Sequence, residues 1–147
     1  MGYANANDLQ ERLGTALLVQ LTDDTGSGAF DESKVAEALE AAQGEVNSYV
    51  ARRCGVPVDV GGEPSLAAVL KSITLDLAAH RLHMRRPPVP DDVRRKRESA
   101  LQWLERVAAG EVVLPSAAAP AGNPAAGLGA AVTGNVRILT RDSLKGL

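Results

Sequence analysis

The chain has 147 residues, enough for one domain around a single hydrophobic core. Aromatic side chains are scarce and alanine and leucine are abundant, a composition typical of packed helices rather than sheets. The lone cysteine, Cys54, excludes an intrachain disulfide and a cysteine metal cluster.

Charge is distributed unevenly along the chain, although the formal net charge is only −2. Residues 1–48 carry nine acids and two bases, whereas residues 81–97 carry seven bases and two acids. A chain of this kind attracts copies of itself head to tail or holds an external partner. There is no signal-peptide pattern at the N-terminus and no apolar run of membrane-spanning length, so we expect a soluble protein made in a cytoplasm, without membrane contact.

Two short helices are predicted at the start of the chain. Asn5 or Asn7 can cap the first, which carries Leu9 and Leu13 and is interrupted by Gly14. The dense apolar segment 15–21 then indicates a second, buried helix.

The next segment, residues 22–30, has the composition of a loop and faintly resembles a calcium-binding loop. Asp23 would occupy the first position of that motif and Gly28 the central glycine. The twelfth position is Lys34, where the motif needs a bidentate glutamate. We therefore expect an acidic loop that ends at a helix cap, without calcium.

The third predicted helix is the least ambiguous. Asp31 caps it, and one apolar face continues to about Arg53, before Gly55 and Pro57 stop the helix. Acidic side chains, Glu37 among them, occupy the opposite face.

The segment 65–86 is the centre of the predicted architecture because it has two apolar faces. One face is formed by Leu66, Val69, Leu70, Ile73, Leu77 and Met84, and the other by Ala67, Ala68, Leu75, Ala78, Ala79 and Leu82. A helix with two apolar stripes must be covered on both sides. Either the same chain or another subunit can do this, and we expect that another chain covers one side.

Three prolines between residues 87 and 90 break the chain, and Asp91 opens a final helix that ends at Gly110. The predicted fold is mainly α: a small bundle of about four to five helices in a domain spanning 1–114. Residues 115–134 form an Ala/Gly/Pro-rich linker, and residues 135–147 form an extended C-terminal arm ending in a short β-strand over 136–140.

Candidate chemical sites are weak. Asp76, His80 and His83 share a helix, but further metal ligands and an HExxH motif are lacking. Cys54 lies at a helix C-terminus, which disfavours a thiolate. We therefore expect no catalytic, cofactor or metal site, and no enzyme activity.

The strongest chemical feature is a basic cluster, Arg81, Arg85, Arg86, Arg94, Arg95, Lys96 and Arg97. Three interpretations stay open: ion pairing with a partner, simple solvation, and contact with nucleic-acid phosphates. No aromatic residue interleaves with the cluster, so stacking on bases is not indicated.

Several sequence features in order resemble a known family. They are a starting YAxxxDL at Tyr3–Leu9, a QLTD with an acidic glycine loop at Gln20–Asp31, the helix running into Tyr49–Arg53, Asp76–His83, and Ala100–Gly110. This order resembles Mu-like prophage proteins of formerly unknown function, and the helical layout is similar to head–tail adaptor, or head-completion, proteins of long-tailed phages. The similarity spans roughly residues 1–114.

The resemblance implies a virion protein at the neck, between head and tail. Such adaptors form a ring of identical copies, commonly a dodecamer, beneath the portal protein. The ring extends the DNA channel without sequence-specific contact and presents a surface to a neck, stopper or tail-terminator protein.

The interface residues that we predict fall into two groups. The acidic helix, with Glu37, Glu40 and Glu45, meets the region of Arg94, Arg95 and Arg97 in a neighbouring copy, and the arm, with Val136, Ile138 and Leu139, adds to a partner strand. The alternative function is a small helical nucleic-acid-binding regulator that uses the Arg81–Arg97 cluster, although the proline break fits a helix-turn-helix poorly.

Overall fold

The computed structural model describes residues 2–114, which form five α-helices. Their bounds are α1 Ala6–Leu13, α2 Thr15–Thr22, α3 Glu32–Val50, α4 Pro64–Met84 and α5 Asp91–Ala109. The mainly helical fold is therefore confirmed. The expected linker 115–134 and the expected strand 136–140 of the arm lie outside the described residues.

Local signals in the sequence set the helix boundaries. The Asn5 side chain accepts a hydrogen bond from the Asp8 N–H, and the Asp8 carboxylate accepts one from the Asn5 N–H, which completes a capping box at α1. Gly14 separates α1 from α2 with a φ of 81°, a conformation that favours glycine. The Asp31 carboxylate accepts hydrogen bonds from two N–H groups in the first turn of α3.

The last helix ends at a junction with α3. Gly110 adopts a left-handed conformation, with a φ of 84°, and a Cβ there would stand 2.8 Å from the Arg53 guanidinium. Arg53 donates hydrogen bonds to the carbonyl oxygens of Ala108 and Ala109, at 3.0 and 2.8 Å. The following Leu114 is buried, so the chain is held against the bundle up to that residue.

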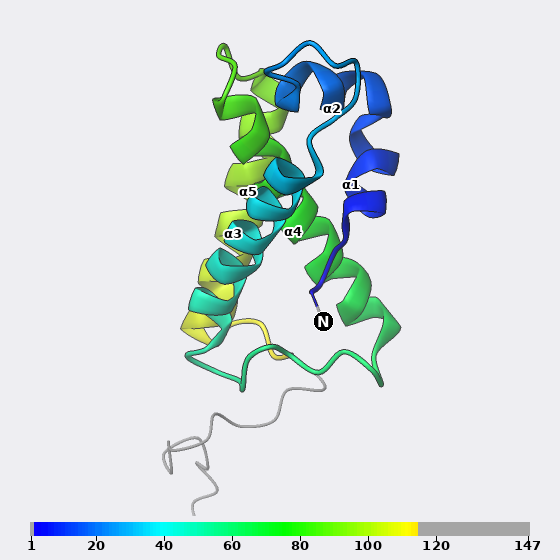
Figure 1. Cartoon of the computed structure of the whole chain (residues 1–147). Helices are drawn as coiled ribbons and strands as arrows, with labels where there is room; N and C mark the ends of the chain where they lie inside the picture. The colour runs from blue at the N-terminus through cyan, green and yellow to red at the C-terminus, as the bar shows by residue number, and fades with distance from the viewer. Residues whose placement is uncertain (1, 115–147) are drawn as a thin grey trace, which may run out of the picture.

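The three long helices, α3, α4 and α5, contact one another and form the body of the bundle (Figure 1). The short helices α1 and α2 pack against α4 as well (Figure 1). The helix α4 thus contacts each of the other four described helices, as expected for a helix with two apolar faces.

The expectation that another chain must cover one face of α4 is wrong for most of that helix. Leu75, Ala78 and Leu82, on the second face, are buried within the single chain. The cause is that α1 and α2 fold back onto α4 and contribute buried leucines, Leu9, Leu18 and Leu21, to the core. Val69 and Met84, on the first face, stay 39% and 62% exposed.

Polar contacts fix α1 and the N-terminus in place. The Lys71 ammonium lies 2.5 Å from the Asp8 carboxylate, and the Arg12 guanidinium lies 2.5 Å from that of Asp76. The Tyr3 hydroxyl donates to Asn47 Oδ1 at 2.7 Å and accepts from the N–H of Val58 at 2.9 Å. Among the residues that the structure describes, no helix is both long and apolar enough to cross a membrane.

Candidate partner interface

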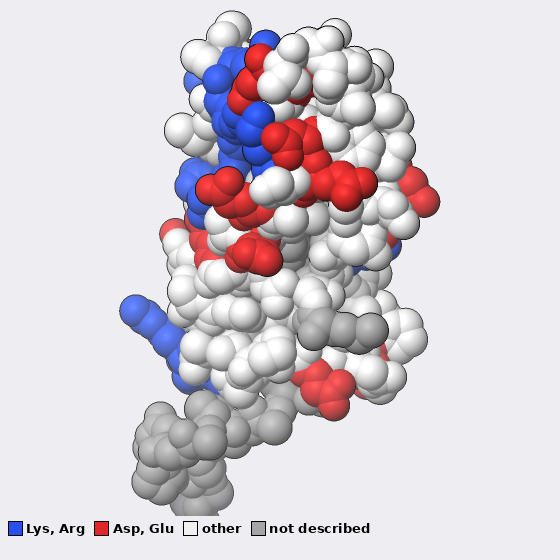
Figure 2. Space-filling model, in the orientation of Figure 1, with Lys and Arg blue, Asp and Glu red and all other residues white. Residues whose placement is uncertain are grey.

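The acidic and basic segments of the sequence meet within one copy of the fold. Figure 2 shows acidic side chains beside a column of basic ones on the face of the bundle that carries α3. Asp24, in the loop after α2, contacts three of these basic side chains. Its carboxylate lies 2.6 Å from the Lys34 ammonium, 2.7 Å from the Arg85 guanidinium and 3.1 Å from that of Arg86. Hydrogen bonds from Lys34 and Arg85, together with the charges of these two side chains, hold the pKa of Asp24 well below its usual range.

Two of the predicted interface residues are paired with each other. The Glu45 carboxylate accepts a hydrogen bond from Arg81 at 2.8 Å and lies 3.7 Å from the Arg97 guanidinium. The attraction between the acidic helix and the Arg94–Arg97 region therefore operates inside the chain at this point. Whether it also operates between copies stays a prediction.

In the first turns of α5, basic side chains form ion pairs with acidic side chains of the same helix. Arg94 forms an ion pair with Asp91, and the Lys96 ammonium lies 3.8 Å from the Asp92 carboxylate. Within residues 2–114, Arg95 has no hydrogen-bonding or ionic partner. Most cations of the basic cluster are thus neutralised locally, which weakens the phosphate-binding interpretation without testing it.

On the acidic side, Glu37 and Glu40 are exposed and have no ionic partner in the described part of the chain. The remaining predicted contacts, Val136, Ile138 and Leu139, lie outside the described residues. Of the interface side chains that can be placed, Glu37, Glu40 and Arg95 are therefore free, whereas Glu45, Arg94 and Arg97 are engaged.

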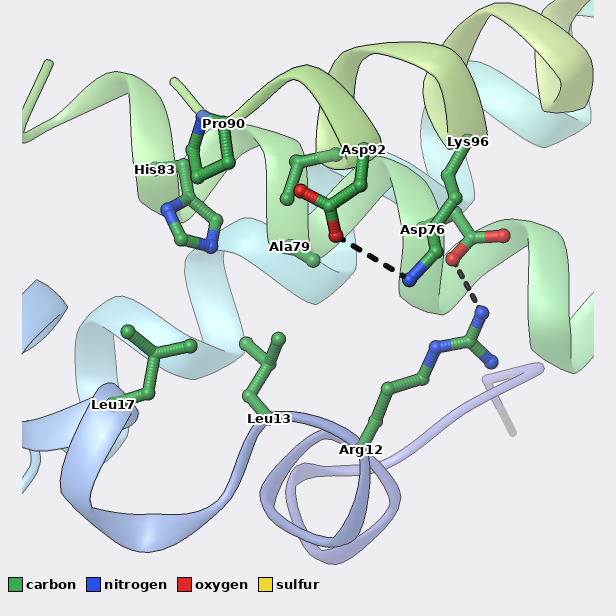
Figure 3. A pocket seen from close by; sticks show the side chains of 10 residues that line it. Arg12, Leu13, Leu17, Asp76, Ala79, His83, Pro90, Asp92 and Lys96 are labelled. Carbon is green, nitrogen blue, oxygen red and sulfur yellow. Dashed lines mark hydrogen bonds and ion pairs between the residues drawn. The ribbon is translucent and has the colours of Figure 1, made fainter. Parts of the chain in front are cut away.

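A pocket of about 260 Å³ lies between α1, α2, α4 and α5 (Figure 3). Leu13, Leu17 and Ala79 make its apolar part, and the Arg12–Asp76 and Lys96–Asp92 pairs border it. The pocket is small and its charges are already matched, so its geometry is that of a packing gap at a helix junction rather than a site for chemistry.

Histidine and cysteine side chains behave as structural groups. His83 borders the same pocket, is buried, and has a lowered pKa, caused first by that burial and opposed by the nearby Asp92 carboxylate. Burial also raises the pKa of the Cys54 thiol, which makes it a weak nucleophile. Asp76 is engaged by Arg12, and across residues 2–114 no three His, Cys, Asp or Glu side chains are placed to hold a metal ion.

The acidic loop resembles a calcium site only in sequence. The Asp23 carboxylate accepts hydrogen bonds from the backbone N–H groups of residues 25–28 at 2.8–3.1 Å, which lowers its pKa to about 2. Lys34 directs its ammonium at Asp24 and Asp31. The loop thus satisfies its own carboxylates with backbone donors and a lysine.

Sequence reasoning missed an open groove between α4 and α5, with a volume of about 500 Å³. Val69, Ile73 and Trp103 provide its apolar lining, and Arg95 and Lys96 line it as well. The periodicity placed Val69 on an apolar face, but it gave no sign that the neighbouring helix leaves this side chain partly uncovered.

The chain is similar in sequence to known phage proteins. Residues 3–132 match the family described as Bacteriophage Mu, Gp36. The chain belongs to this family. It is also similar to the Mu-like prophage FluMu protein gp36 of Haemophilus influenzae, with 31% identity over 112 residues that cover 76% of this chain and 74% of the relative. The predicted membership of a Mu-like prophage family is therefore confirmed, and the chain is a phage protein.

Proposed function

We propose that the chain is a structural protein of the virion, a head–tail connector of the adaptor or head-completion type, and not an enzyme. The observation that carries the proposal is the match to the Mu Gp36 family over most of the chain. The five-helix layout supports it, because it is the layout that the sequence resemblance to phage adaptors implies. The absence of any motif for chemistry in the sequence agrees with it.

In this role, copies of the chain assemble as a ring, of dodecameric symmetry by the resemblance, between the portal protein and a neck, stopper or tail-terminator protein. The ring extends the DNA channel. DNA passes without sequence-specific contact, which suits a surface whose arginines are mostly paired with acids of the same chain. The arm at 136–140, by our proposal, adds a strand to a partner.

The test uses a phage that encodes this chain, with its gene inactivated. We expect DNA-filled heads and free tails that do not join, and we expect the purified full chain to restore joining and infectivity when it is added to such an extract. Gold-labelled antibody against the chain should mark the neck in electron micrographs. Complete, infectious particles formed without the chain would refute the proposal.

The nucleic-acid-binding alternative is distinguished by one binding measurement on the purified chain. A mobility shift of duplex DNA that weakens steeply with salt would favour a regulator. A connector in free solution should show at most weak, sequence-independent binding.

A further inference from the structure

Two surfaces of the described bundle carry charged side chains that have no strong ionic partner within the chain, and one of these surfaces is basic and the other acidic. The first is the α4–α5 groove, in which the 39% exposed Val69 lies with Trp103. Its positive edge is available for a partner: Arg95 is unpaired within the described part of the chain, and Lys96 is only weakly engaged. The Lys96–Asp92 pair spans 3.8 Å between side chains that are 56% and 69% exposed, so solvent screens it strongly.

The second surface is the exposed edge of α3, where Glu37 and Glu40 point to solvent without ionic partners among residues 2–114. Beside them Ala38 and Ala41 line a shallow pocket with three cations, Lys34, Arg81 and Arg85, and each of these cations is already paired with an acid of the same chain. Small side chains next to two free carboxylates leave room for another molecule to approach the helix closely. This surface is therefore complementary in charge to the groove.

The two surfaces lie on different sides of α4. At about 100° per residue, Val69 and Ile73, which line the groove, point about 120° away around the helix from Arg81 and Arg85, which lie beside the α3 edge. A contact between two different patches of one molecule is heterologous. Repeated head to tail, such a contact generates a closed ring when the rotation between copies closes, and a filament when it does not.

We propose that the α4–α5 groove binds the Glu37–Glu40 edge of α3 in a second copy of the chain. Burial of Val69 and Trp103 supplies the apolar part of the contact, and the facing charges set its orientation. The proposal rests on the proposed function, since it names the contact that joins the subunits of the ring. The sequence predicted that Glu37, Glu40 and Glu45 meet the region of Arg94, Arg95 and Arg97 in a neighbouring copy. The proposed contact keeps only the two glutamates Glu37 and Glu40, facing Arg95 and Lys96. Glu45, Arg94 and Arg97 are left out because they already form ion pairs within the chain.

Two charge-reversal variants of the full chain test the contact. One carries Glu37→Arg and Glu40→Arg, and the other carries Arg95→Glu and Lys96→Glu. Each variant then has two surfaces of like charge, so we expect its self-association to weaken at least about a hundredfold relative to the wild type, by sedimentation velocity over a concentration series at low salt. An equimolar mixture of the two variants should assemble again, because every groove then meets an α3 edge of opposite charge.

Matched controls are Arg52→Glu and Glu105→Arg, which reverse exposed charges without ionic partners elsewhere in the described bundle. These variants should associate like the wild type, and circular dichroism should show all variants folded. A wild-type chain that stays monomeric at every concentration, a reversal variant that assembles normally, or a mixture that stays monomeric would each overturn the proposal.

An assay of head–tail joining shows whether the proposed contact or the proposed function is wrong. If the wild-type chain joins heads to tails and the Arg95→Glu, Lys96→Glu variant does so equally well, the contact is wrong and the function stands. If the variants and their mixture behave as expected but the wild-type chain does not join heads to tails, the contact stands and the function is wrong.

Discussion

Truncation of Leu9 to alanine tests whether the single chain covers the second face of α4. Leu9 is fully buried, and α1, which carries it, packs against α4. Removal of a buried leucine side chain costs about 2–5 kcal/mol, through lost transfer free energy and the cavity that remains. For a domain near 100 residues this corresponds to a fall in melting temperature of roughly 10–25 °C. Val113→Ala is the matched control, because that side chain is 83% exposed and lies outside the proposed contact between copies, so its truncation should cost about 1 kcal/mol or less.

The measurement is urea unfolding of the full chain, followed by circular dichroism at several protein concentrations. If α1 covers α4 within one copy, the difference in free energy of unfolding between the wild type and the Leu9→Ala variant has the expected size at every protein concentration. A loss no larger than that of Val113→Ala would refute the reasoning. A loss that disappears at high concentration would show instead that another chain completes the core.

Four further predictions concern the N-terminal cap, the Tyr3 hydroxyl, the buried histidines and the C-terminal arm. Asn5→Ala removes the side-chain half of the capping box and should lower the free energy of unfolding by about 0.5–2 kcal/mol in the same assay. Tyr3→Phe leaves Asn47 Oδ1 and a backbone N–H without their partner and should lower the free energy of unfolding by about 1–3 kcal/mol in the same assay. Burial lowers the pKa of both His83 and His80, so the unfolded chain takes up these protons near pH 6.5 before the folded chain does. Stability should therefore be full above pH 7 and fall as the pH drops toward 5, and a His83→Gln variant should remove the His83 part of this fall and leave the His80 part. Carboxylates with lowered pKa, such as Asp23, titrate below this window and should not contribute to it. Finally, a chain that stops after residue 114 should keep the unfolding midpoint of the full chain but fail to restore head–tail joining in extracts; restoration by this shorter chain would contradict a role for the arm.

Most of the helical framework could be predicted because its signals are local. Asn5 and Asp31 each act on N–H groups within three residues, and Gly14 and Gly110 each terminate a helix through their own backbone conformation. The apolar residues of the last helix recur at helical spacing, and four of them are buried: Val93, Ala100, Leu104 and Val107.

The partners of the charged residues could not be predicted, because they depend on which helices lie side by side. The charge asymmetry was evident in the sequence, but Asp24 and Arg85 are about 60 residues apart, and nothing local shows that the loop after α2 meets the end of α4. The same uncertainty produced the error about α4. Its two apolar faces were read correctly, whereas the ability of α1 and α2 to cover one of them depends on how the chain turns at Gly14 and after Thr22.

The junction of Arg53 with the final turn of α5 has a mechanical consequence. Because one guanidinium grips two carbonyl oxygens of α5 from the end of α3, the chain leaves Leu114 from a fixed corner of the bundle. In the ring that we propose, this corner would recur at the same height in every copy. A force applied at Leu114 would reach the end of α3 through the two Arg53 hydrogen bonds as well as α5, so two long helices would share it.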